Sequence, residues 1–396
     1  MKPSQKVQDI KQSLEIFNYD GWLLYDFRKT NPLACKILEI PAEKMLTRRF
    51  FYWIPRQGEP IKIVHSIEAN VLEHLPGKSM TYSSWQELDS HLETILKGFR
   101  KIAMEYSPGN AIPYVSKVDA GTVEKIRGFG VEVVSSADLL QKYTSVWTEK
   151  QLDMHLEAAD VLDTSVNRAW RWIASHLKDG ATITEYDVQQ FLLEEFEKHG
   201  CVSQDPPICA VNAHSADPHY SPSDKRGEII KKGDFILIDL WCKRKLPQAV
   251  YADITRVGVA APHASEKIEK IFNIIKKARD AAIMFLRNRL SQDLPVMGWE
   301  IDQACRDVII DAGYGKYFTH RTGHSIGEQD HGDGANIDNF ETQDLRHLLP
   351  GSCFSIEPGI YLPGEFGIRL EHDVYIEGDG KNFRVTGGTQ EEIVIL

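Results

Sequence analysis

The first part of the chain alternates short β-rich runs with segments whose apolar residues have helical spacing. Runs of β-branched and aromatic residues predict strands at residues 21–25, 50–54, 61–64 and 131–134. Apolar residues three and four positions apart predict helices over residues 86–99 and 116–126. The pair Gly128 and Gly130 lacks the third glycine of a dinucleotide-binding fingerprint. The pattern therefore indicates an α/β domain without a glycine-rich phosphate loop.

A second domain is predicted to begin at residue 148. Thr148 and Gln151 form a capping-box pattern, in which each side chain can accept a free backbone N–H at the start of a helix. A long amphipathic helix is expected from there to about Leu177, with further helices over residues 184–199 and 265–290. Strand candidates lie at residues 235–240, 250–259, 353–361, 367–376 and 392–396. Because the strands cluster late, we predict an α+β domain over residues 148–396, preceded by a smaller α/β domain over residues 1–147.

Composition excludes several classes of protein. The chain has 396 residues, of which 42% are hydrophobic and 26% charged, so it can bury a sizeable core and is not expected to be disordered. Its net charge of −11 argues against nucleic acid as a partner. No apolar run approaches the ~18 residues that span a bilayer, and the amino terminus has no signal-peptide core. The six cysteines include no CxxC pair, so we expect reduced thiols in a cytoplasmic protein that is not bound to a membrane.

Four carboxylates occupy positions where a strand favours an apolar side chain: Asp239, Asp253, Glu357 and Glu371. Any one of them could be an ordinary exposed or salt-bridged strand residue. Burying all four without a partner would cost several kcal/mol for each, so together they need a positive counterpart. Two divalent cations would neutralise four carboxylates if one or two of the side chains bridge the ions.

Histidines that could complete such a site lie close together in the sequence, at His320, His324 and His331. His320 and His324 have the spacing of the zinc helix HExxH, but no Glu follows His320, and Gly323 and Gly327 weaken a helix. A shell rich in oxygen with one imidazole favours Mn²⁺, with Co²⁺ and Zn²⁺ as alternatives.

A different chemistry is suggested by Gly323-His324-Ser325-Ile326-Gly327, which matches the GxSxG nucleophile elbow of serine hydrolases. That elbow requires a buried strand before the serine and a helix after it. The polar, glycine-rich sequence that follows does not predict a helix, so we disfavour this reading.

Four motifs carry a resemblance to a known family: Asp239-Leu-Trp with Tyr251-Ala-Asp253-Ile-Thr-Arg256, Gly323-His324-Ser-Ile-Gly327, Ile356-Glu357-Pro-Gly-Ile-Tyr361 and Gly367-Ile-Arg369-Leu-Glu371. Together they resemble the pita-bread metallopeptidases, which include methionine aminopeptidase, aminopeptidase P and prolidase. The motifs cover roughly residues 150–396. Residues 1–147 resemble the creatinase-type amino-terminal domain of the proline-specific members.

The resemblance implies roles for named residues. The metal ligands would be Asp239, Asp253, His324, Glu357 and Glu371, with Asp253 and Glu371 bridging two divalent ions. Glu357 would also move a proton between water and the leaving nitrogen. His219 and His331 would be catalytic and would contact substrate, and His320 and Arg369 would be further substrate-binding residues.

The resemblance also implies an activity and an assembly. We expect an exopeptidase that hydrolyses the Xaa-Pro bond at the amino terminus of peptides through a hydroxide bridging the two metals, acting as a homodimer. A prolidase restricted to Xaa-Pro dipeptides and a non-hydrolytic pita-bread binding protein are the alternatives.

Two segments depart from the family pattern. Asp239 and Asp253 are farther apart than is usual, and Trp241 stands where the family has a glycine. We interpret residues 242–248 as a lengthened hairpin turn that leaves both ligands in place. The sequence after His331 is also unusual, so it does not define that wall of the pocket.

Overall fold

The computed structural model describes residues 2–225 and 227–396. The chain divides into two compact units, Met1–Thr144 and Ser145–Leu396. The sequence places the boundary three residues later, at the cap of the first helix of the second unit. None of the described helices is long and apolar enough to cross a membrane.

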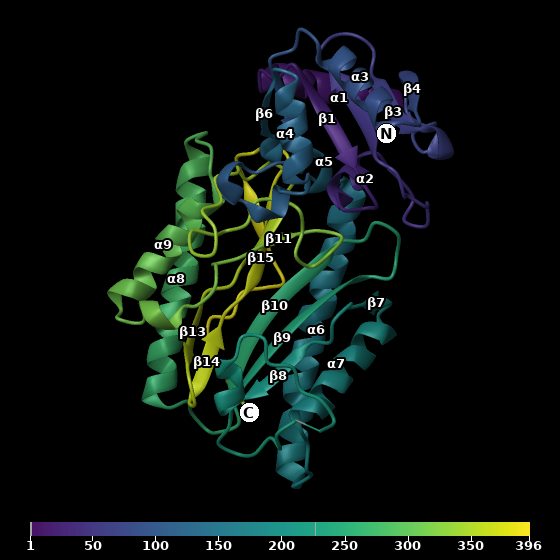
Figure 1. Cartoon of the computed structure of the whole chain (residues 1–396). Coiled ribbons are helices and arrows are strands. Elements are labelled where there is room, and N and C mark those ends of the chain that lie inside the picture. Colours follow the sequence, from purple (N-terminus) through teal and green to yellow (C-terminus); the bar gives the residue numbers. More distant parts are fainter. Residues whose placement is uncertain (1, 226) are drawn as a thin grey trace. The chain divides into compact units, whose positions relative to one another are not determined.

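The amino-terminal unit is built on a six-stranded sheet with the order β4-β3-β2-β1-β5-β6 (Figure 1). Only β2 is antiparallel to its neighbours, and the other five strands point the same way. The strands are β1 (Gly21–Asp26), β2 (Phe50–Pro55), β3 (Ile61–His65), β4 (Lys78–Tyr82), β5 (Lys101–Met104) and β6 (Glu132–Ser135).

Helices cover both faces of this sheet because its strands are apolar on both sides. In β1, Trp22 and Leu24 face the core shared with α1, α2 and α5, whereas Leu23 and Tyr25 face the core shared with α3 and α4. The helices are α1 (Pro3–Ile16), α2 (Pro32–Ile37), α3 (Trp85–Leu96), α4 (Ala120–Gly128) and α5 (Ala137–Thr144). The three layers are those of an α/β domain.

Strands β4 and β5 and helices α1, α2 and α5 were not predicted, and one predicted helix begins later than expected. The helix expected over residues 116–126 begins at Ala120, because the Asp119 carboxylate caps it by accepting the backbone N–H of Thr122. Helix α1 was not predicted, since its apolar residues are separated by many charges. It buries Val7, Ile10 and Leu14 against the sheet.

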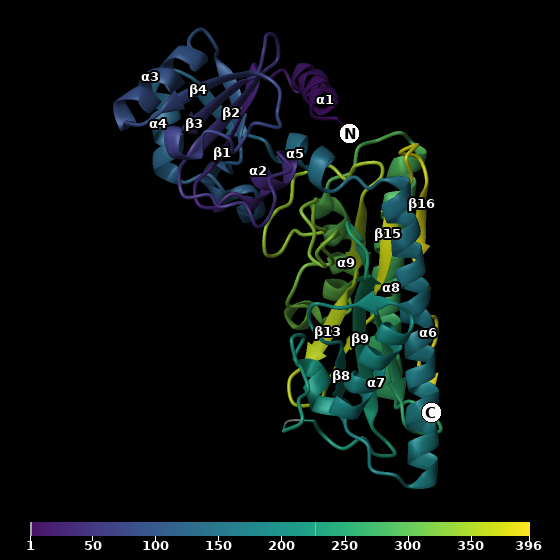
Figure 2. The same ribbon diagram turned by 90° about the vertical axis from the view of Figure 1, so that its right-hand side faces the viewer.

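The carboxy-terminal unit has two halves, in each of which a pair of helices covers strands; the strands of the second half form a four-stranded and a two-stranded sheet (Figures 1 and 2). Helices α6 and α7 share one core with β8 and one face of β9 and β10, whereas α8 and α9 share another with β12 to β15 and the other face of β9 and β10. The helices are α6 (Glu149–Asp179), α7 (Glu185–Lys198), α8 (Glu266–Ser291) and α9 (Gly298–Asp311). The strands are β7 (Cys201–Val202), β8 (Ile208–Val211), β9 (Phe235–Arg244), β10 (Tyr251–Val259), β11 (Ser325–Ile326), β12 (Cys353–Ile356), β13 (Gly359–Leu362), β14 (Phe366–Arg369), β15 (His372–Ile376), β16 (Phe383–Thr386) and β17 (Val394–Ile395).

The start of α6 follows the predicted capping box. Thr148 accepts the backbone N–H of Gln151, and the Gln151 side chain accepts the N–H of Thr148. The helix ends at Gly180, whose φ of 71° places it in the left-handed region that glycine tolerates.

Three predicted elements of this unit were wrong in detail. The strands expected over residues 353–361 and 367–376 are each broken, the first after Ile356 and the second after Arg369. Pro358 contributes to the first break because it has no N–H to donate to a ladder. The turn expected from residue 242 begins later, since β9 continues to Arg244 and pairs Lys243 with Tyr251.

A buried histidine ties α6 to the sheet. The ring of His155 is fully buried, and its Nδ1 lies 2.7 Å from the Tyr251 carbonyl oxygen, while its Nε2 lies 2.7 Å from the Thr386 hydroxyl. Burial lowers the pKa of His155 from 6.5 to about 4. The folded protein therefore holds the neutral ring, and stability that is complete above pH 6.5 is lost as the pH falls towards 4.

We predict that His155→Gln removes part of the acid sensitivity of folding. Between pH 7 and pH 5 the wild type should lose about 2 kcal/mol of unfolding free energy through this group, and the variant should not. Urea unfolding at both pH values measures the difference. His263→Gln, which changes an exposed histidine, is the control. Equal pH dependence in the wild type and His155→Gln would contradict the prediction.

Candidate metal centre

The register of the β9–β10 hairpin places two of the predicted ligands on one face of the sheet. Asp239 pairs with Thr255, and Asp253 pairs with Trp241. Directly paired residues share a face, as do residues two apart in a strand, so Asp239, Asp253 and Thr255 all point the same way. All three are buried, with relative exposures of 6%, 4% and 0%.

The two glutamates come from the breaks in the other half of the unit. The ladder pairs Ile356 with His372 on one side of the breaks and Gly359 with Arg369 on the other, leaving Glu357 and Glu371 between these pairs. Strands β14 and β15 lie against β10. The interrupted ladder thus brings both glutamates next to the aspartates of the first half.

His324 is held by a close approach of two backbones. An added Cβ at Gly323 would lie 1.9 Å from the Ser355 carbonyl oxygen, so only glycine fits before this histidine. The backbone N–H of His324 donates to Ser355 Oγ at 3.0 Å. The imidazole Nε2 then lies 3.5 Å from Glu357 Oε1 and 3.8 Å from Asp253 Oδ2.

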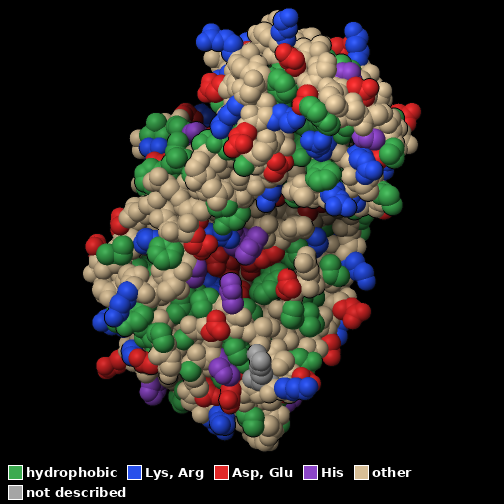
Figure 3. Space-filling view, viewed as in Figure 1, with side chains coloured by type: hydrophobic (Ala, Val, Ile, Leu, Met, Phe, Trp, Pro, Cys, Tyr) green, Lys and Arg blue, Asp and Glu red, His purple; other side chains and the backbone are tan. Residues whose placement is uncertain are grey.

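The five predicted ligands therefore lie in one cluster. Ligand atoms of Asp253, His324 and Glu371 lie within 4.8 Å of one another. The fourth predicted ligand, Asp239, is connected to these three through Thr255, whose Oγ1 lies 3.0 Å from Asp239 Oδ1 and 2.6 Å from Glu371 Oε2. Glu357, the fifth, is next to His324. Figure 3 shows acidic and histidine side chains gathered in a hollow of the molecule.

Burial and mutual repulsion dominate the electrostatics of this cluster. Burial and the neighbouring Glu371 raise the pKa of Asp253 well above its ordinary value. Burial and Glu357 do the same to the pKa of Glu371. Burial raises the pKa of Glu357 to about 7, although the nearby Arg369 opposes the shift. Burial also lowers the pKa of His324. Ionised carboxylates at this site therefore need more positive charge than the imidazole supplies.

Arg369 is the cation closest to the cluster. Its guanidinium contacts Asp239 through Nη2, donates to Thr255 Oγ1 at 3.0 Å, and lies 3.8 Å from Glu357 and 3.9 Å from Glu371. One positive charge thus faces three carboxylates. Asp253 Oδ1, moreover, is buried without a hydrogen-bond partner in the described residues. An oxygen-rich donor set with one imidazole and an unpartnered buried oxygen fits divalent cations.

The predicted pocket residues fall into two groups. His331 lies at the open side, with a side chain 67% exposed and a ring centroid 4.2 Å from that of His324. His219 is also exposed. Partial burial, Arg321 and His219 together lower the pKa of His331, which shows that His219 is near it. His320 and Arg369 belong to the wall instead, because both contact the Tyr361 hydroxyl, at 2.8 and 3.0 Å.

Three residues of the site were not identified from the sequence. Thr255 could have been, since it lies two residues after Asp253 and so shares its face. Tyr361 lies in a motif that was noted but was given no role. Asp330 gave no signal in the sequence. It lies within 4.8 Å of the ligand atoms of His324 and His331, and burial and Asp239 raise its pKa to about 8.

The structure does not support a nucleophile elbow at Ser325. This residue lies in the short strand β11, and its Oγ accepts the backbone N–H of Gly334. The described residues that follow form turns and bends rather than a helix. The arrangement required for a serine nucleophile is therefore missing from this part of the chain.

Comparison with known families agrees with the geometry. Residues 153–378 match the model of metallopeptidase family M24. The chain belongs to metallopeptidase family M24. Its predicted family is therefore confirmed, and so is its character as a metallopeptidase.

Individual relatives support the fold of this M24 metallopeptidase. An uncharacterized peptidase from Staphylococcus aureus strain USA300 is 28% identical over 258 residues, covering 64% of this chain and 67% of that protein. A prolidase from Thermococcus sibiricus superposes with a TM-score of 0.64 at 22% identity, covering 100% of both chains. An X-prolyl aminopeptidase from Caenorhabditis elegans, described as a cytosolic enzyme with a di-nuclear active site, superposes with a TM-score of 0.61 at 16% identity over 100% of this chain and 63% of that one. The pita-bread α+β fold is confirmed.

We predict that Glu371→Gln weakens the stabilisation that added metal gives to the protein. Without metal, the variant should unfold at a higher temperature than the wild type, because one repelling carboxylate is gone. With Mn²⁺ added, it should gain far less stability. Its affinity should fall by more than about 100-fold, since even residues that only orient a ligand contribute about 10- to 100-fold. Thermal unfolding and calorimetric titration of metal-free protein measure both effects.

The matched control for this prediction is Glu365→Gln. It makes the same charge change in a half-exposed pair with Lys267, and it should alter neither the unfolding temperature nor the metal affinity. Unchanged Mn²⁺ affinity in Glu371→Gln would show that this glutamate is not a ligand.

Proposed function

We propose that this M24 metallopeptidase is a dinuclear exopeptidase that removes the amino-terminal residue from peptides whose second residue is proline. The observation that carries the proposal is the convergence of Asp253, His324 and Glu371 within 4.8 Å, beside Asp239 and Glu357. Such a cluster has the charge and donor set for two divalent ions.

The residues that would hold the ions are Asp239, Asp253, His324, Glu357 and Glu371. When bound, the ions would lower the pKa of a water molecule and polarise the scissile carbonyl. We propose Mn²⁺ because four of the five donors are carboxylates, with Co²⁺ and Zn²⁺ as alternatives.

Glu357 would move the proton in this proposal. Of the four acidic ligands its side chain is the most exposed, at 14%, against 9% for Asp239, 6% for Asp253 and 2% for Glu371. A carboxylate that reaches both the buried cluster and the open side can take a proton from water and give it to the leaving nitrogen.

The histidines would orient the substrate. His331 and His219 lie at the open side, where an imidazole N–H can donate to the oxygen that gains charge or to a substrate carboxylate. His320 would act through Tyr361, and Arg369 holds Asp239 in position.

Specificity for proline is supported by two observations. The amino-terminal unit is a complete α/β layer structure of the kind expected for the proline-specific members. In addition, similar structures include a prolidase and an X-prolyl aminopeptidase. Proline has no amide N–H, so its peptide bond needs an enzyme that does not rely on that donor.

Two further candidates share the same centre. A prolidase restricted to dipeptides is favoured by the likeness to the Thermococcus enzyme. A binding protein would keep the cluster of metal ligands but would not hydrolyse peptides. We also propose that the protein acts in the cytoplasm as a homodimer, without a nucleic-acid or membrane partner.

Substrate length and sequence separate these candidates. We expect Mn²⁺-loaded protein to release the first residue from Ala-Pro-Ala faster than from Ala-Pro, to leave Ala-Ala-Ala uncut, and to lose activity with a chelator. Cleavage of Ala-Pro alone would establish the prolidase. Tight metal binding without cleavage of any of the three would establish the binding protein. The measurement is the amount of free amino acid released, determined by chromatography.

A variant of His331 would show whether this histidine has a catalytic role or binds metal. We predict that His331→Ala lowers kcat/KM about 100- to 1000-fold, as loss of an oxyanion donor does, while metal content remains at two ions per chain. His263→Ala, at another exposed histidine, should leave both quantities unchanged. Loss of one ion in His331→Ala would instead identify His331 as a ligand.

A further inference from the structure

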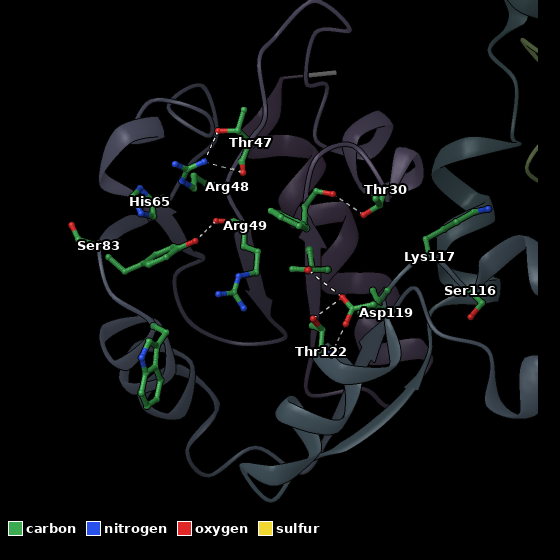
Figure 4. Close-up of a pocket in the computed structure, with 15 residues that line it drawn as sticks. Thr30, Thr47, Arg48, Arg49, His65, Ser83, Ser116, Lys117, Asp119 and Thr122 are labelled. Carbon is green, nitrogen blue, oxygen red and sulfur yellow. Dashed lines mark hydrogen bonds between the residues drawn. The ribbon is translucent and has the colours of Figure 1, made fainter.

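A cavity of about 770 Å³ opens in the amino-terminal unit, at the edge of the sheet where β1, β3 and β4 end and β2 begins (Figure 4). In sheets of parallel strands this carboxyl edge is where small ligands bind, because the loops leave a crevice beyond the strand ends. Its volume falls within the range of small-molecule sites. No residue of this unit takes part in the proposed hydrolysis.

The cavity is lined by three cationic side chains, Arg48, Arg49 and Lys117. Within residues 2–225 and 227–396, no carboxylate forms an ion pair with any of them, although the chain as a whole is acidic. The Arg48 guanidinium donates to Thr47, through the backbone oxygen at 3.3 Å and the hydroxyl at 3.0 Å, while the Arg48 backbone N–H donates to the Glu68 carboxylate at 3.2 Å. In Figure 4 the Lys117 side chain points away from the two arginines, so Arg48 and Arg49 supply the positive charge of this concave surface.

The single acid of the lining, Asp119, offsets part of this charge, but its oxygens are held by neighbouring groups. Asp119 caps α4, accepting the backbone N–H of Thr122 at 2.8 Å and its hydroxyl at 2.8 Å. It also accepts the Tyr25 hydroxyl at 3.2 Å. Its oxygens are thus engaged within the lining and at the start of the helix.

Arg49 and His65 are positioned as donors. The Arg49 side chain points into the open space in Figure 4, and its backbone oxygen accepts the Tyr82 hydroxyl at 2.7 Å, which fixes the chain there. His65 Nδ1 accepts the backbone N–H of Ile67 at 3.1 Å. In the neutral ring the proton must then be on Nε2, which leaves an N–H available.

Aromatic side chains supply a second type of contact. Trp85 is 64% exposed and Phe27 is 38% exposed, which is unusual for side chains of this size. Both line the cavity together with Tyr82. Exposed rings beside cations can stack a planar group while the cations hold a negative one.

We propose that this cavity binds a small organic dianion that carries a planar ring, the chemistry of a nucleoside monophosphate. Arg48 and Arg49 would hold the phosphate, and Trp85 would stack on the ring. Guanidinium groups bind phosphate through paired N–H donors, which makes Arg49 the central residue.

Calorimetric titration of the full-length protein with AMP, inorganic phosphate and adenosine tests this proposal. The titrations are run with a chelator, so that no anion can bind through metal, and are repeated with Mn²⁺. We expect saturable 1:1 binding of AMP, tighter than that of phosphate or adenosine, both with chelator and with Mn²⁺. Arg49→Gln should weaken AMP binding roughly ten- to hundredfold, the effect of losing a charged hydrogen-bond donor.

Arg127→Gln is the matched control, since Arg127 is exposed in α4 of the same unit and does not line the cavity. It should bind AMP as the wild type does. Far-UV circular dichroism checks that each variant is folded, and Arg48→Gln repeats the test if Arg49→Gln is not. Absence of saturable AMP binding, AMP binding no tighter than phosphate or adenosine, or equal loss in Arg127→Gln would overturn the proposal.

Discussion

Repulsion among buried carboxylates is the constraint on which the carboxy-terminal unit depends. Asp239, Asp253 and Glu371 are almost entirely removed from water, and Glu357 nearly so. Each ionised group in such surroundings raises the free energy of the others. A chain that gathers them must either keep them protonated or balance them with cations.

The fold meets this constraint by dividing the acids between two supports. The aspartates are fixed by a continuous hairpin, whereas the glutamates emerge where two strands are interrupted. Thr255 and Arg369 connect the two supports through side-chain hydrogen bonds. The halves are therefore held in register by the same groups that line the site. A change in either sheet would alter the spacing of the acids.

Much of this arrangement could be predicted from the sequence, but not all of it. Acids inside apolar runs identified Asp239 and Asp253, because a lone charge in a strand conflicts with its surroundings. The same reasoning placed Glu357 and Glu371 in unbroken strands, which was wrong. A break in a ladder depends on which partner strand lies alongside, and a single sequence does not contain that information. Asp330 was missed because its neighbours along the chain are polar, and only the folded loop brings it to His324.

The loop of the β9–β10 hairpin has a practical consequence. Residues 245–248 are exposed, and the pairing that positions Asp239 and Asp253 starts only beyond them. Lengthening a flexible loop adds little entropic cost once its ends are held together. A fluorescent label or affinity tag inserted there would thus be tethered to the strands that carry both aspartates without entering the centre, and could follow its occupancy in real time.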